Sequence, residues 1–102
     1  MHPSIANKQA EIAALCRSHH VRRLEVFGSA AAGDFDPARS DADFLVEFET
    51  GAHANTFADY FDLKASLEEL LGRPVDLVMP AAVRNRYFLD SIESSREPVY
   101  GA

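Results

Sequence analysis

The spacing of apolar residues along the chain predicts helices in four segments. In the longer segments, apolar side chains recur every three or four positions, as on the buried stripe of an amphipathic helix. Gly72 follows one of these segments and predicts its end, because glycine favours the backbone conformation that closes a helix. The expected helices cover residues 4–19, 28–33, 56–71 and 81–95.

Short apolar runs between the helices predict three strands, over residues 21–27, 43–48 and 74–79, and the tail 98–100 could pair briefly. Because each helix has a single apolar stripe, the simplest packing is a three-stranded mixed sheet with helices mainly on one face, an α/β (α+β) fold. The aromatic residues of the third helix are then expected in the core, as apolar anchors. They are Phe57, Tyr60 and Phe61.

Length and composition match one ordinary soluble domain. The chain has 102 residues, of which 47% are hydrophobic and 25% charged. No apolar run approaches the roughly 18 residues of a membrane span, and the first residues lack the features of a signal peptide. We therefore expect a cytoplasmic protein with no membrane role. The single cysteine, Cys16, permits no internal disulfide and is expected to be a small core residue.

The net charge of −6 argues against nucleic acid as a direct partner, because phosphate contacts require a basic surface. The nearest candidate for such a surface straddles a helix end and a strand start, where cations are favourable in any case. Its members are Arg17, His19, His20, Arg22 and Arg23.

Two carboxylates open the second expected strand. Asp41 and Asp43 are two positions apart, so on a strand they point to the same face. They could hold one divalent metal, or bridge two metals about 3.5–4 Å apart as in phosphoryl-transfer sites. Gly28 and Ser29 follow the first strand, where backbone N–H groups and a hydroxyl can hold phosphate oxygens. Together these features suggest chemistry on a nucleoside triphosphate.

A third acid, Asp76, interrupts the apolar third strand. A carboxylate there is costly unless it meets a cation or a metal. If this strand lies beside the second, Asp76 can join Asp41 and Asp43 on the face without helices. The alternatives are that Ser40-Asp41 only starts a turn, or that Asp-x-Asp belongs to a phosphatase or a glycosyltransferase, whose folds usually need a longer chain.

The chain has a Gly-Ser turn, then Asp-x-Asp, then an acid in the third strand. With its motifs in this order, it resembles the minimal nucleotidyltransferases of the DNA polymerase beta superfamily. The resemblance is carried by Gly28-Ser29, by residues 40–46 (SDADFLV) and by residues 73–78 (RPVDLV). It implies that residues 1–102 form a single minimal nucleotidyltransferase domain. The implied reaction is Mg²⁺-dependent transfer of AMP from ATP to a hydroxyl, with two metal ions at the site.

Roles follow from this resemblance by position. Asp41, Asp43 and Asp76 would be the catalytic metal ligands, and Gly28 and Ser29 would bind the β- and γ-phosphates. Members of this branch are often antitoxins that adenylylate a HEPN-domain toxin on tyrosine. The resemblance therefore implies a HEPN-type toxin as the protein partner.

The sequence departs from the family pattern at Ala32, where the family often has arginine. This departure keeps open an alternative function, a catalytically weak or inactive antitoxin that neutralises its partner by contact. A purely structural domain is a third hypothesis, and it predicts no stabilisation by Mg-ATP.

Overall fold

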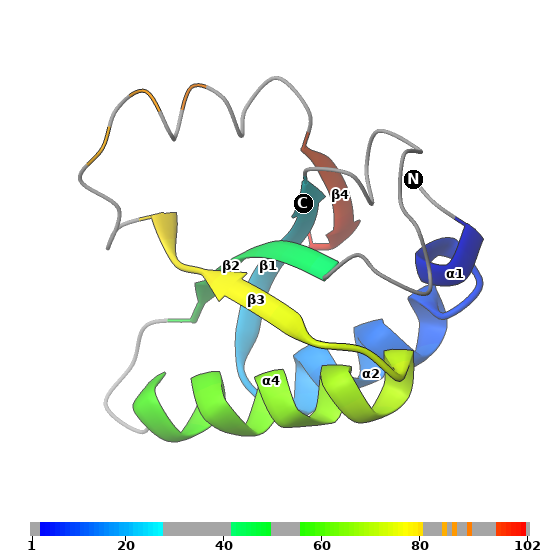
Figure 1. The fold of residues 1–102 in the computed structure, drawn as a ribbon. Coiled ribbons are helices and arrows are strands. Elements are labelled where there is room, and N and C mark those ends of the chain that lie inside the picture. Colours follow the sequence, from blue (N-terminus) through cyan, green and yellow to red (C-terminus); the bar gives the residue numbers. More distant parts are fainter. Residues whose placement is uncertain are drawn as a thin grey trace.

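The computed structural model describes residues 3–27, 42–49, 56–80, 85, 87, 90 and 96–101. Its centre is a mixed sheet with the strand order β3-β2-β1-β4 (Figure 1). β1 pairs antiparallel with β2 and with β4, whereas β2 and β3 are parallel. The strands are β1 (Val21–Phe27), β2 (Ala42–Phe48), β3 (Val75–Val78) and β4 (Glu97–Tyr100).

The mixed α/β architecture confirms the expected fold class, but the described residues already form a sheet of four strands and not three. The tail does more than pair briefly, because β4 lies along β1 as an edge strand. Its four residues include Pro98, which lacks a backbone N–H and is tolerated only where a ladder bond can be missing. The tail alone therefore gives a weak strand pattern, and its pairing with β1 makes it a strand.

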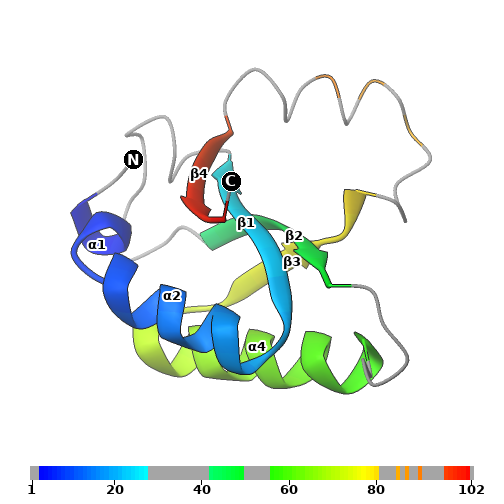
Figure 2. The ribbon, with the colours of Figure 1, turned by 180° about the vertical axis from the view of Figure 1, so that it is seen from behind.

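Two long helices, α2 (Gln9–Ser18) and α4 (Thr56–Leu71), lie on the same side of the sheet (Figures 1 and 2). The single helix expected over residues 4–19 is instead divided into α1 (Pro3–Ala6) and α2 by a turn at Asn7 and Lys8. Asparagine is a weak helix former, because its side chain competes for backbone hydrogen bonds.

Two expected helices are not tested by the structure. The segment 28–33 lies outside the described residues, and so does most of 81–95. Within the described part of the chain, no helix has both the length and the apolar character needed to cross a bilayer.

The core lies between the sheet and the two long helices. Alternate residues of β1 and β2 point into it, as the two-residue period of a strand requires. The residues of these elements with no solvent exposure are Ile12, Cys16, Leu24, Val26, Ala42, Phe44, Leu63 and Leu67.

The aromatic residues of α4 do not follow the sequence expectation. Phe57 and Phe61 are 75% and 51% exposed, and only Tyr60 packs against the core. Among the described residues β3 is the edge strand on this side of the sheet, and none of their strands lies beyond it to cover this flank of α4. The expectation that all three rings are core anchors was therefore wrong for Phe57 and Phe61.

Candidate functional site

The register of the sheet places two of the predicted acids side by side. Asp43 of β2 pairs with Phe27 of β1 on one side and with Asp76 of β3 on the other. Residues at one register position of neighbouring strands point to the same face. Phe44, the neighbour of Asp43, packs in the core beneath the sheet, so these three side chains point to the opposite face, here called the open face because none of the described helices covers it.

Asp43 and Asp76 lie at the backbone spacing of paired strands, which suits two ligands of one cation. Neighbouring strands lie about 4.8 Å apart, Asp76 is exposed, and Asp43 is half-buried. Carboxylate oxygens on a partly solvated surface are the ligands that Mg²⁺ prefers. Among the described residues no group of three or more acidic, histidine or cysteine side chains could hold a metal. The carboxylates of Asp43 and Asp76 are chemically suited to be two of the ligands of a divalent metal.

The remaining predicted site residues lie outside the described residues. Gly28 and Ser29 follow Phe27 directly in the chain, and Asp41 precedes Ala42. Phe27 pairs with Asp43. The end of β1, which precedes Gly28 and Ser29 in the chain, therefore lies beside the start of β2, which follows Asp41, at the level of the carboxylate pair. Ala32 is also outside the described residues.

An apolar cluster lies next to the carboxylate pair on the open face. Phe27 and Leu45 form a buried apolar cluster, and the partly buried Val78 packs against it. Leu45 and Val78 occupy one register position, two residues further along the strands than the acids. This cluster gives the carboxylates a rigid apolar border on one side.

A network of charged residues continues the open face beyond this cluster. Arg23 pairs with Glu25 at 3.3 Å (Nε to Oε1) and also with Glu47. Arg96 reaches the same Oε1 of Glu25 at 3.5 Å. Glu25 is only 8% exposed, and a carboxylate so buried needs such cations. This network was not predicted from the sequence, although charges two apart in a strand, as in Arg23 and Glu25, indicate a shared face.

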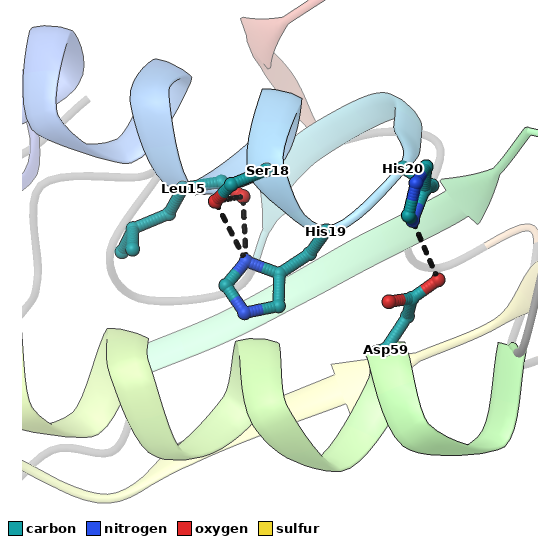
Figure 3. Close-up of polar contacts among 5 residues, drawn as sticks. All are labelled: Leu15, Ser18, His19, His20 and Asp59. Atoms are coloured by element: carbon teal, nitrogen blue, oxygen red, sulfur yellow. Dashed lines mark hydrogen bonds and ion pairs between the residues drawn. The ribbon is translucent and has the colours of Figure 1, made fainter.

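The histidines between α2 and β1 have structural contacts (Figure 3). At the end of α2, His19 Nδ1 lies 2.7 Å from the carbonyl oxygen of Leu15, and Ser18 Oγ donates to the same oxygen at 3.1 Å. His20 has a positive φ of 60°, and its Nδ1 lies 3.1 Å from Asp59 Oδ2 of α4. Of the basic cluster, His19 therefore contacts the end of α2, as a cationic or donor side chain at a helix C-terminus can, whereas His20 connects the start of β1 to α4.

Comparison with known proteins adds independent evidence. Residues 10–99 match the nucleotidyltransferase domain family. A Methanocaldococcus jannaschii protein, provisionally named a protein adenylyltransferase, is 36% identical over 75 residues, covering 74% of this chain and 73% of the relative. The protein adenylyltransferase MntA of Thermococcus cleftensis is 38% identical over 65 residues, covering 64% of this chain and 62% of the relative.

Solved structures give the same fold. A protein provisionally described as a minimal nucleotidyltransferase superimposes with a TM-score of 0.78 at 32% identity, covering 96% of each chain. A complex of a tri-AMPylated HEPN toxin of Shewanella oneidensis with an MNT antitoxin superimposes with a TM-score of 0.65 at 18% identity, covering 96% of this chain and 73% of the other. At 18% identity the second likeness shows the fold alone.

Proposed function

Because the chain belongs to the nucleotidyltransferase domain family, we propose that it transfers AMP from Mg-ATP to a tyrosine hydroxyl of a partner protein. The observation that carries this proposal is the pairing of Asp43 with Asp76 at one register position of the open face. Two carboxylates there gather negative charge at one point, which a divalent cation offsets.

Asp43 and Asp76 would hold the metal, with Asp41 as a third ligand. Bound Mg²⁺ neutralises charge on the phosphates and on the leaving group. In the transfer, the acceptor oxygen bonds to the α-phosphorus of ATP, the bond from that phosphorus to the bridging oxygen breaks, and pyrophosphate leaves. Asp76 is exposed and would take the hydroxyl proton. Gly28 and Ser29 would bind the β- and γ-phosphates.

The partner is proposed from the relatives. Two are named protein adenylyltransferases, which favours a protein acceptor over a small molecule. Complexes of the same fold include a HEPN toxin carrying AMP groups and a toxin–antitoxin complex with AMP-PNP. We therefore propose that the acceptor is a HEPN-type toxin and that the chain, as a single minimal domain, acts as its antitoxin.

The test is adenylylation of the protein encoded by the neighbouring gene, which the proposal expects to be a HEPN-type protein. Incubation with Mg-ATP should raise the mass of that protein by one or more AMP units in mass spectrometry. The variants Asp43→Asn and Asp76→Asn should each lower the rate at least about 100-fold, because a lost metal ligand removes several kcal/mol of transition-state stabilisation. EDTA should abolish the reaction.

Glu47→Gln is the matched control, because Glu47 is an acid of the same strand that pairs with Arg23 and lies beyond the apolar cluster. It should retain transfer. If the wild-type chain neutralises an unmodified partner, the enzyme proposal fails. Contact inhibition is then the function, as the alanine at position 32 suggested.

A further inference from the structure

An apolar groove lies between the first turns of α4 and the end of β3. Its volume is about 540 Å³, and among the described residues it is lined by Thr56, Phe57, Tyr60, Phe61, Leu77, Val78 and Met79. None of these lining residues is charged.

The aromatic side chains of the groove form an ordered cluster. The ring centroids of Phe57 and Phe61 are 4.9 Å apart, and Tyr60 meets Phe61 edge-on at 5.1 Å. Tyr60 is held in place by its hydroxyl, which donates to the carbonyl oxygen of Leu77 at 2.7 Å. The rings are therefore positioned before any ligand arrives, which lowers the entropy that binding costs.

The exposure of two adjacent phenylalanines needs an explanation. Phe57 and Phe61 keep 75% and 51% of their surface in contact with solvent, and burying such rings is strongly favourable. Single exposed apolar residues are common on protein surfaces, whereas contiguous apolar patches mark binding sites.

Val78 connects this groove to the proposed catalytic acids. It lines the groove and also packs against Phe27 and Leu45 on the open face. It is two residues from Asp76 on the same strand, so the two side chains share a face about 7 Å apart. The groove therefore reaches Val78, two residues along β3 from Asp76, while its other walls belong to α4, Leu77 and Met79.

We propose that this groove binds the acceptor protein, through a segment whose large apolar side chains lie a few residues from the hydroxyl that receives AMP. This inference rests on the proposed function. The relatives are named for a protein acceptor, and a segment bound at Val78 would bring its hydroxyl to Asp76. An uncharged apolar groove does not suit the triphosphate, whose charges need cations or N–H groups.

The test combines Phe57→Ala with Phe61→Ala. Calorimetry without nucleotide measures binding of the protein encoded by the neighbouring gene, which the proposed function expects to be a HEPN-type protein. The double variant should bind at least about tenfold more weakly, because buried aromatic anchors dominate interface energy. Its thermal stabilisation by Mg-ATP should match that of the wild type. Tyr87→Ala is the matched control, since Tyr87 is 86% exposed and is not among the groove residues, and it should leave binding unchanged.

Each other outcome separates this inference from the proposed function. Unchanged partner affinity in the double variant overturns the groove, even if AMP transfer is observed. A loss of Mg-ATP stabilisation instead assigns the groove to the nucleotide, and a loss of self-association alone assigns it to a second copy of the chain.

Failure of the wild type to bind the partner overturns the groove as well. A wild-type chain that binds through the phenylalanines but transfers nothing keeps the groove and refutes the enzyme.

Discussion

Burial determines the chemistry of Cys16. Its side chain has no solvent exposure and packs in the core between α2 and the sheet. Desolvation raises the pKa of this thiol from 9.0 to about 12, and the charge of Arg17 lowers it only in part. The thiolate is the nucleophilic form of cysteine, so Cys16 is inert in the folded chain. This confirms the sequence interpretation of Cys16 as a core residue.

The same pKa predicts an alkaline loss of stability. Between pH values of about 9 and 12 the folded chain keeps the thiol proton and the unfolded chain releases it. The unfolded state then binds fewer protons, so the free energy of unfolding falls as the pH rises through this range. In Cys16→Ala this fall should be shallower, as measured by urea unfolding at pH values up to about 10.5. Parallel pH profiles of the two proteins would contradict the prediction.

At the scale of secondary structure, side chains of the helices cap both edge strands. Glu68 of α4 accepts the backbone N–H of Val75 at 3.1 Å, and Tyr60 donates to Leu77 on the same strand. On the other edge, Gln9 of α2 donates to the carbonyl of Val99 at 3.2 Å. Unpaired edge groups invite pairing with other chains, so these contacts both position the helices and protect the sheet.

The Glu68 contact predicts a difference between two substitutions. Glu68→Ala leaves the Val75 N–H without its carboxylate. It should lower the free energy of unfolding by about 1 kcal/mol, which is the usual contribution of a partly solvated hydrogen bond. Glu68→Gln keeps an acceptor oxygen and should lose less than half of that. Urea unfolding measures both. If both variants lose the same free energy of unfolding, the Glu68 side chain stabilises the fold through its negative charge, and its hydrogen bond to β3 adds nothing.

At the scale of the whole molecule, the arrangement of layers decides where chemistry can occur. α2 and α4 cover one face of the sheet (Figure 2), so polar groups of the strands are on the other. β4 closes the far edge beside β1 and contributes Val99, which is 5% exposed, to the core. The last strand therefore completes the sheet that holds the carboxylate pair.

Removal of this strand should affect both stability and association. A chain that ends at Arg96 loses the burial of Val99 and should be less stable by at least about 2 kcal/mol. It also exposes the edge of β1, so it should self-associate as its concentration rises. Unfolding by urea and light scattering measure the two effects.

Val99→Ala in the full chain separates packing from pairing. It should lower stability by about 1–2 kcal/mol through the lost methyl groups, and the chain should stay as dispersed as the wild type. If the truncated chain is equally well dispersed, β4 does not protect the edge of β1.

Local patterns predicted most of the fold. The bounds of β1 and α4 agree with those expected, and β2 begins one residue earlier. These segments have strong periodicity, which depends on side chains only a few positions apart. β4 was underestimated because it is short, contains proline and is stabilised by β1, which is distant in sequence.

For the candidate site, the sequence by itself supplied the acids, the family resemblance and the condition that β3 must lie beside β2. Only the tertiary structure decided that Asp43 and Asp76 share one register position, that Arg23 and Arg96 pair with Glu25, and that Phe57 and Phe61 are exposed. The physical reason is the range of the interactions. Helix and strand periodicity are local, whereas strand neighbours, register and the coverage of a helix flank depend on residues far apart in the chain.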